Sequence, residues 1–452
     1  MRLLGGDDLA TLPRHVRIAL SKAAGRSPAA LRQPKVQLGL LGILEERLDG
    51  VVYERIVGQQ VAAAKRAAQR LDGKSRSSYA RDDLHDMMRG WGFMLLPEND
   101  PTFYEPRYLA SLLRESGQTG GQFVHRTPSS AGERFRTAWA RLAPANTSPI
   151  AFTTTGSDAN NLLYDIARSV KGPSAEILAL DGVYGGARGK AAELGFMHNN
   201  HQYADLRIVS PHSYYFKPTD AAEIQRLEVL EEKALAQIAD RVNQGKKPIG
   251  GLLLEPIVGA RGVLFYRPEF LKKLRELCDQ LRIPIFADEI LTGGGRTGRF
   301  FAYQHYDGFE PDFITFGKGL QIAGVARVSR HGQGYYANWS GTTTDGSQEA
   351  LLKGAQVLNR IADGNLMENA RVMGDYLLTK LRERLPASPG VMPAVNPYAN
   401  GDGPVRGMGL LLLCPRSGVL PVDGAMGRLM PYLTITRAEI DRLAREAGSG
   451  RR

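Results

Sequence analysis

The chain has 452 residues, of which 43% are hydrophobic and 23% charged, so it can fold into two domains with large cores and has the composition of a globular protein. Its net charge of +11 would suit an anionic partner, but the basic residues are scattered among acidic ones, so no nucleic-acid scaffold is expected as a partner. Two cysteines, Cys278 and Cys414, exclude a disulfide framework, and no signal peptide or run of 18 apolar residues is found, so we expect a cytoplasmic protein without a membrane span.

The first predicted unit, residues 1–125, is a mainly helical segment in which we identify no chemistry. Alanines and straight-chain side chains favour a helix over residues 53–71. A glycine-rich loop at 117–122 follows, and the sequence RFRTAWARLA after it predicts another helix.

From residue 150 the pattern changes to strands that alternate with helices. The strand segments are IAFTTT, EILALD, LRIVSP, IGGLLLE, IPIFADE and DFITF. Such alternation predicts an α/β domain with a mostly parallel sheet, whose functional residues lie at the carboxyl ends of the strands.

The segment SDANNLLYDIARSV, at 157–170, predicts a helix with Ser157 as its N-cap and an apolar face. Gly156 precedes it, so the backbone N–H groups and the positive dipole end of this helix offer a phosphate site. A plain capped helix without a ligand is the alternative.

Two candidate site residues, Asp288 and Lys318, follow buried strands further along the chain. Asp288 comes after the apolar IPIFA, where an ionised carboxylate needs a cation, although a loop cap is the alternative. Its neighbour Glu289 points the other way along the strand and is the weaker candidate. Lys318 lies between two glycines at the end of the following strand. A lysine there can form a Schiff base, and a nearby carboxylate can keep a pyridine nitrogen protonated.

The sequence GGGRTG, at 293–298, also fits the dinucleotide-binding pattern GxGxxG, with Asp312 as the following acid. That pattern needs glycines that join a strand directly to a helix and an acid that ends the next strand. Here Asp312 begins a strand, so a nicotinamide-dependent oxidoreductase is the less favoured interpretation.

Four motifs together resemble the class III aminotransferases, of the ornithine or 4-aminobutyrate type. They are EPI, DEI followed by TGGGRTG, PDFITFGKGL and TTGSDAN, and the resemblance covers roughly residues 150–440. It implies the fold type I architecture of the pyridoxal phosphate enzymes, with a large α/β domain over 126–335 and a smaller α+β domain over 336–452. It also implies pyridoxal 5'-phosphate as the cofactor, no metal, and a homodimer with shared active sites.

The resemblance assigns cofactor contacts to Gly156, Ser157, Tyr184, Asp288, Ile290, Lys318, Thr342 and Thr343. Lys318 and Asp288 are the implied catalytic residues, which bind the cofactor carbonyl and the ring nitrogen. Tyr184 stacks on the ring, although a tyrosine packed at a loop is the alternative. Thr342, with Thr343 beside it, reaches the phosphate of the neighbouring subunit, and an N-cap cluster for the following helix is the alternative.

The chain departs from the family pattern at several of these places. Asp158 stands where the family usually has glutamate, Gly185 where it commonly has histidine, and Leu291 where some members have glutamine. After the lysine, the family's longer glycine-rich stretch is shortened to QIAGVARVSR.

Two arginines are the predicted substrate contacts. Arg428 aligns with the arginine that grips a substrate carboxylate in the ornithine-type enzymes, for which a guanidinium is well suited. In those enzymes a glutamate can mask the arginine, and Ala260 stands at that position here. Arg428 is then open to carboxylate, which favours reaction at the α-amino group of an amino acid. Arg261 either adds a second anion contact or lies in solvent.

The leading interpretation is therefore a class III aminotransferase that acts on an α-amino group. An alternative keeps the cofactor but eliminates or replaces a β- or γ-substituent or forms a carbon–carbon bond in natural-product biosynthesis, with S-adenosylmethionine as one plausible γ-substituted substrate. A binding protein that merely retains the fold is a third interpretation, against which the pair of Asp288 and Lys318 argues, since folding needs neither residue.

Overall fold

The computed structural model describes most of the chain from Met94 onward. The described residues are 94–97, 100–105, 107–112, 130–197, 201–213, 217–261, 263–329, 342, 344–384, 412–414, 427–429 and 431–448. The helix expected over 53–71 and the loop at 117–122 lie outside them. The sequence RFRTAWARLA forms most of helix α7 (Ser130–Ala140) and the turn after it, which confirms that expectation.

The described residues contain one large sheet of seven strands, in the spatial order β1-β9-β8-β7-β4-β2-β3. Its strands are β1 (Thr147–Thr153), β2 (Glu176–Leu180), β3 (Arg207–Ile208), β4 (Ile249–Leu254), β7 (Ile285–Asp288), β8 (Phe313–Phe316) and β9 (Ala323–Val328). The five neighbouring strands from β8 to β3 run parallel, while β9 is antiparallel to both β1 and β8. The expected mostly parallel sheet of an α/β fold is thus confirmed.

Strand β9 is the strand of the large sheet that sequence reasoning missed. The stretch QIAGVARVSR, interpreted as a shortened glycine-rich segment, contains this strand in the interior of the sheet. Its glycine permits a close approach, because a Cβ at Gly324 would lie 2.2 Å from the carbonyl oxygen of Ala151 and 2.7 Å from the ring of Phe316. Small residues therefore mark close packing between strands here rather than a loop.

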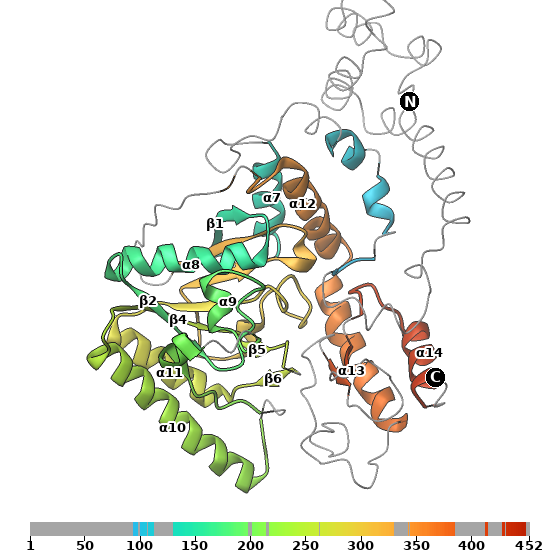
Figure 1. Cartoon of the computed structure of the whole chain (residues 1–452). Coiled ribbons are helices and arrows are strands. Elements are labelled where there is room, and N and C mark those ends of the chain that lie inside the picture. The colour runs from blue at the N-terminus through green and yellow to red at the C-terminus, as the bar shows by residue number, and fades with distance from the viewer. Residues whose placement is uncertain are drawn as a thin grey trace, which may run out of the picture.

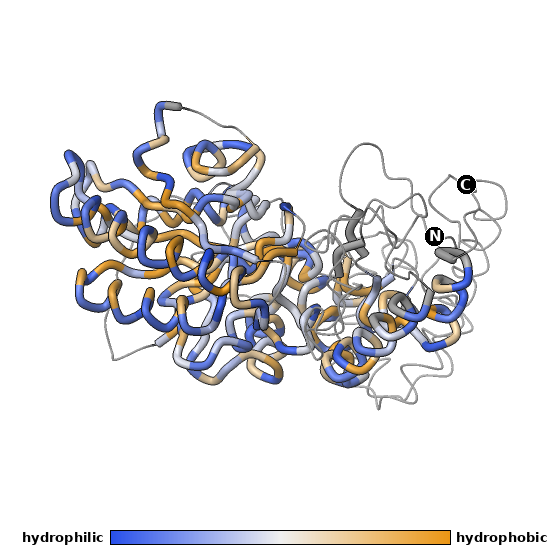
Figure 2. The backbone as a smooth tube through the Cα atoms, turned by 90° about the horizontal axis from the view of Figure 1, so that it is seen from below, coloured by the Kyte–Doolittle hydropathy of each residue, from blue (hydrophilic) through white to orange (hydrophobic). Residues whose placement is uncertain are grey.

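Helices cover both faces of this sheet (Figure 1). On one face lie α8 (Gly156–Lys171) and α9 (Lys190–Leu194), and on the other lie α7, α10 (Ala221–Gln244), α11 (Pro268–Leu281) and α12 (Gln348–Asp363). Alternate residues of β4 serve the two layers, since Leu253 packs with α8 whereas Leu252 and Leu254 belong to the core on the opposite face. Figure 2 shows the resulting hydrophobic interior.

The remaining described elements are smaller or lie to the side of the sheet. Helices α13 (Leu366–Arg384) and α14 (Arg437–Gly448) pack against each other, and β10 (Leu412–Cys414) pairs with β11 (Gly427–Leu429). A hairpin of β5 (Ile257–Val258) and β6 (Leu264–Phe265) follows β4. Short 3-10 turns are η2 (Pro101–Tyr104), η4 (His201–Leu206), η5 (Ala302–His305) and η6 (Lys318–Leu320).

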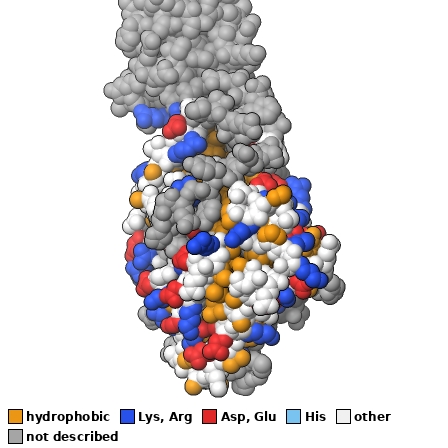
Figure 3. Space-filling view, turned by 90° about the vertical axis from the view of Figure 1, so that its left-hand side faces the viewer, with side chains coloured by type: hydrophobic (Ala, Val, Ile, Leu, Met, Phe, Trp, Pro, Cys, Tyr) orange, Lys and Arg blue, Asp and Glu red, His pale blue; other side chains and the backbone are white. Residues whose placement is uncertain are grey.

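The described surface carries charges of both signs. On the face shown in Figure 3, basic and acidic side chains are interspersed, as the scattered charges of the sequence lead one to expect. Within the described part of the chain, no helix has both the length and the apolar character that a membrane span requires.

The sequence GGGRTG forms a series of turns after β7 and does not join a strand directly to a helix, so the dinucleotide interpretation lacks its structural context. Its arginine, Arg296, is fully buried and donates to the carbonyl oxygens of Met94 (2.8 Å) and Pro431 (3.0 Å). Burial lowers the pKa of Arg296 to about 10, so the side chain still carries its charge at neutral pH. The arginine thereby joins three segments that are remote in sequence.

We expect Arg296→Ala to lower the free energy of unfolding by about 3 kcal/mol, because two buried carbonyl groups lose their donor and a cavity forms. Urea unfolding of the purified protein measures this loss. The matched control is Arg299→Ala, since Arg299 is exposed on the same turn and its removal should cost less than about 0.5 kcal/mol. Equal midpoints for the two variants would contradict the joining role of Arg296.

Candidate active site

The candidate site lies where the parallel strands end. Asp288 is the last residue of β7, and Lys318 follows β8, its parallel neighbour. The expected placement of an acid and a lysine at the ends of adjacent strands is thus confirmed. Lys318 has a backbone φ of +45°, a conformation that costs a residue with a side chain about 1 kcal/mol and that occurs often at functional sites.

Asp288 is a buried carboxylate surrounded by hydrogen-bond donors. Its side chain accepts from Asn160 Nδ2 (2.7 Å) and from the backbone N–H of Ile290 (3.1 Å). Burial raises the pKa of Asp288, while the bonds from Asn160 and Ile290 and the positive charge of Lys318 act in the opposite direction. The acid is therefore placed to hold a further cation, such as a protonated ring nitrogen.

Asn160, on α8, is the residue that orients this carboxylate. Besides its bond to Asp288, its amide donates to the carbonyl oxygen of Gly185 (3.1 Å) and accepts from Thr315 Oγ1 (2.8 Å). Sequence reasoning quoted both SDANN and DFITF but assigned no role to Asn160 or Thr315. The sequence held one indication of this role: Asn160 is a polar amide in a helical segment whose residues Ala159 and Leu163 belong to the core.

The start of α8 differs from the prediction in its cap. Ser157 is wrong as the N-cap: Thr155 has the non-helical backbone, its Oγ1 accepts from the N–H of Asp158 (3.2 Å), and it donates to the Asp158 carboxylate (2.6 Å). Ser157 instead accepts from the N–H of Ala187 (2.9 Å). The first-turn backbone of α8 still offers the N–H groups that an anion requires.

Two further predicted cofactor residues, Gly156 and Ile290, pack directly against each other. A Cβ at Gly156 would lie 2.7 Å from Ile290 Cδ1, so only glycine allows α8 to begin this close to the end of β7. Because Ile290 also donates its N–H to Asp288, this contact joins the helix start to the buried acid.

Tyr184 lies half-buried on the turn after β2, where its backbone N–H donates to Glu255 Oε1 (2.7 Å). The next residue explains one departure from the family. Gly185 has φ +69°, and a Cβ there would lie 2.2 Å from the carbonyl oxygen of Ala191. This backbone therefore has no room for the histidine that the family commonly carries.

Glu255 follows β4 and is the second buried acid of the site. Its Oε2 accepts from the backbone N–H of Gly259 (2.9 Å). Burial, followed by the nearby charge of Asp288, raises the pKa of Glu255 to about 7, against the effect of its two backbone hydrogen bonds and of Lys318. The motif EPI contained this residue, but the sequence alone did not reveal its partners.

Glu289, the weaker candidate, is a structural residue of the neighbouring turn. It accepts from the hydroxyl of Thr292 and from the backbone N–H groups of Ala302 (3.0 Å) and Tyr303 (2.8 Å). Burial raises the pKa of Glu289 to about 7. All these partners lie between β7 and β8, so the side chain serves the turn.

The threonine turn is held beside the start of α8 within the same chain. Asp345 accepts from the N–H of Thr342 (2.6 Å) and from both the N–H (2.9 Å) and the hydroxyl (3.1 Å) of Thr154. Ser347, rather than a threonine, caps α12. Thr343 lies outside the described residues.

The two predicted substrate arginines are described to different extents. Arg261, near the tip of the β5–β6 hairpin, pairs with Asp181 (3.3 Å) and lies over the ring of Phe196 (5.6 Å). It is therefore not simply surrounded by solvent. Arg428 lies in β11, opposite Leu413 of β10, and its side chain is outside the described residues.

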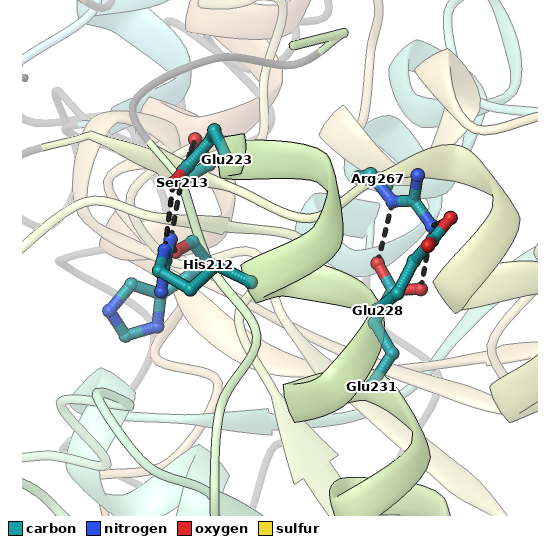
Figure 4. A network of polar contacts seen from close by, with 7 residues as sticks. His212, Ser213, Glu223, Glu228, Glu231 and Arg267 are labelled. Carbon is teal, nitrogen blue, oxygen red and sulfur yellow. Dashed lines mark hydrogen bonds and ion pairs between the residues drawn. The ribbon is translucent and has the colours of Figure 1, made fainter. Parts of the chain in front are cut away.

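The base of this hairpin is anchored to α10 (Figure 4). Ser213 exchanges two backbone hydrogen bonds with Phe265 of β6 (2.7 and 2.8 Å), and its hydroxyl donates to Glu223 Oε1 (2.7 Å). Arg267, just after β6, pairs with Glu231 (2.7 Å) and Glu228 (3.3 Å). The tip with Arg261 thus projects from a fixed base.

The side chains and backbone groups of this site fit pyridoxal phosphate. Lys318 offers an amine for the carbonyl, Asp288 an acid for the ring nitrogen, Tyr184 an aromatic face, and the start of α8 N–H groups for the phosphate.

Known proteins resemble this chain in both sequence and structure. L-lysine-epsilon aminotransferase of Mycobacterium tuberculosis is 32% identical over 233 residues, which are 47% of this chain and 50% of that protein. The 5-aminovalerate aminotransferase of Pseudomonas putida is 30% identical over 263 residues, 57% and 58% of the two chains. The acetylornithine aminotransferase of Lactococcus lactis is 30% identical over 230 residues, 46% and 56% of the two chains. The chain thus spans about half the length of these curated relatives.

Solved structures match over a larger share. The lysine aminotransferase of M. tuberculosis in its internal aldimine form superposes with a TM-score of 0.66 at 25% identity, over 79% of this chain and 88% of that one. This likeness agrees with the fold type I architecture seen here. The family model of class III aminotransferases matches residues 122–446. The chain therefore belongs to the class III aminotransferase family, whose members depend on pyridoxal phosphate.

Proposed function

We propose that the chain is an aminotransferase that acts on the α-amino group of an amino acid. The observation that carries this proposal is the placement of Lys318 and Asp288 at the ends of adjacent parallel strands, with Asp288 oriented by Asn160. When bound, pyridoxal phosphate supplies a carbonyl carbon for the substrate amine and a ring that withdraws electrons from the substrate Cα.

The residues of this chain have distinct tasks in that reaction. Lys318 Nζ would hold the cofactor at rest and then, as a free amine, move the proton of the substrate Cα. The carboxylate of Asp288 would keep the ring nitrogen protonated. The start of α8 would bind the phosphate, and the ring face of Tyr184 would pack on the cofactor.

Whether the α-amino or the terminal amino group of the substrate reacts depends, in this proposal, on the hairpin tip and on Arg428. The name of one relative, L-lysine-epsilon aminotransferase, specifies a terminal amino group. In this chain Ala260 stands where the resemblance implied a glutamate that masks the substrate arginine. Arg428 would then hold the α-carboxylate at all times, and Arg261 would contact a second anionic group.

A homodimer belongs to this proposal. The resemblance assigns Thr342 and Thr343 to the phosphate of the neighbouring subunit, and Thr342 lies exposed on a turn that Asp345 anchors near the start of α8. Cytoplasmic location stays a prediction from the cysteine content.

The second candidate function is elimination, replacement or carbon–carbon bond formation with the same cofactor. Gly185 favours it, because the backbone there excludes the side chain that the family commonly places beside the ring. Release of a β- or γ-substituent without transfer of the amino group to a keto-acid acceptor would select this function.

The cofactor assignment is tested by Lys318→Ala. We expect kcat to fall by more than about 1,000-fold, because the variant loses both the cofactor link and the proton-moving amine. Assays of product formation measure kcat, and the visible absorption of the purified protein reports the loss of the cofactor link. Lys273→Ala, an exposed position on α11, serves as the control with unchanged kcat. Normal turnover by the Lys318 variant would refute the assignment.

Asn160→Asp tests the orientation of the buried acid. Asp288 must be ionised, so activity is lost as pH falls through its pKa, which burial already raises. The substitution replaces a donor by a second carboxylate, so the acid limb of kcat/KM should move to higher pH and kcat should fall by about 10- to 100-fold. Asn359→Asp, beside Arg141 on the surface, is the control. Identical pH profiles for the two variants would contradict the proposal that Asn160 orients Asp288.

The choice of amino group is tested by amino donors. We expect keto-acid formation from α-amino acids and little reaction with 5-aminovalerate, because the carboxylate at Arg428 should bring the α-amino group to the cofactor. Arg428→Ala should raise KM for α-amino acids by about 10-fold or more, since a charge-assisted double hydrogen bond is lost. Preference for 5-aminovalerate, or an unchanged KM in the variant, would contradict α-amino specificity.

A further inference from the structure

Glu255 connects two loops that approach the candidate site from different strands. Its Oε1 accepts from the N–H of Tyr184, in the turn after β2, and its Oε2 accepts from the N–H of Gly259, at the start of the hairpin tip. The side chain is only 5% exposed, so water cannot readily replace either bond.

The two loops also touch outside this carboxylate. A Cβ at Gly182 would lie 3.4 Å from Arg261 Cδ and 3.5 Å from Val258 Cγ1. The ion pair of Arg261 and Asp181 bridges the same loops, but its side chains are 39% and 49% exposed. Solvent screens such a pair, so the buried bonds of Glu255 hold the loops more strongly than the surface pair does.

The chemistry of the link requires a carboxylate. Both partners of Glu255 are backbone N–H donors, and above a pH of about 7, where this buried carboxyl is ionised, it presents an acceptor to each of them. A glutamine in the same place would turn its own NH₂ donor towards one of these N–H groups. The neighbouring buried acid Glu289 differs, because its partners Thr292, Ala302 and Tyr303 all belong to one segment between β7 and β8.

We propose that Glu255 is a positioning residue that couples the Tyr184 turn to the hairpin tip with Arg261. The aromatic face of the cofactor site and the side chain proposed to contact substrate are then held as one unit. The consequence for cofactor and substrate rests on the proposed function, whereas the coupling of the loops does not.

The first test is hydrogen exchange of the full chain without added cofactor, at a pH above the Glu255 pKa of about 7, for Glu255→Gln and for Glu289→Gln as the matched control. In the Glu255 variant, we expect the amides of Tyr184 and Gly259 to exchange about 10-fold faster together, because one charge-assisted acceptor serves both. The amides of β4 should keep their wild-type rates. The Glu289 variant should loosen Ala302 and Tyr303 and leave Tyr184 and Gly259 unchanged.

A shorter acid provides a second variant. Glu255→Asp keeps the charge but lacks one methylene group, so it should protect one of the two amides and release the other. Wild-type exchange at both amides in either Glu255 variant would overturn the coupling. Faster exchange spread evenly over the sheet would also overturn it, because that pattern means general destabilisation.

The second test uses the protein loaded with pyridoxal phosphate. In Glu255→Gln, the visible circular dichroism of the bound cofactor should weaken and its Kd should rise about 10-fold, since Tyr184 is no longer fixed. Glu289→Gln should retain both properties. An unchanged signal and Kd in the Glu255 variant would overturn the positioning role. Should the wild-type protein bind no pyridoxal phosphate, the proposed function fails, and the exchange experiment still decides the coupling.

Discussion

The proposed cofactor site depends on one buried carboxylate, Asp288, at the end of a parallel sheet. An isolated carboxylate at this depth would take up a proton, because burial disfavours its charged form. The Asn160 amide, the Ile290 N–H and the charge of Lys318 oppose that effect and come from three different elements. The helix, the strand end and the lysine turn must therefore meet at one point, and the glycine at 156 allows them to do so.

Three buried acids of similar chemistry have different tasks because their donors differ. Among the described residues, the donors to the Glu289 carboxylate all lie in the segment after β7, whose shape this side chain fixes. Glu255 accepts one N–H from each of two loops and connects them. Asp288 is supported by a side-chain amide next to a lysine and can also hold a cation. Burial alone therefore does not show which of these acids is functional. What each one does depends on the elements that supply its hydrogen-bond donors.

The sequence was sufficient for features that local pattern controls. Alternating strands and helices predicted the α/β fold, and the neighbouring strand ends of Asp288 and Lys318 followed from it. Strand β9 was missed because its small residues suggest a loop until their contacts with other strands are known. The cap of α8 was misplaced because TTTGS offers several hydroxyl residues, and the contact of Gly156 with Ile290 limits where the helix can begin. Asn160 and Glu255 acquire their roles only through residues remote in sequence.

Under the proposed function, the hairpin tip is the place where the anion contact of this chain could change while the base of the hairpin stays fixed. Its base is fixed by Ser213 and by the pairs of Arg267 with α10, so changes at the tip need not propagate into the sheet. Arg261 pairs there with the half-exposed Asp181, and exposed pairs of this kind contribute about 0–1 kcal/mol. A substrate anion could replace Asp181 as the partner of Arg261 at a similarly small cost. Burial and the charge of Arg261 lower the pKa of the nearby His212 to about 4, so this histidine adds no positive charge at neutral pH. Within the described hairpin tip, anion recognition would thus rest on Arg261, on a loop whose position Glu255 sets.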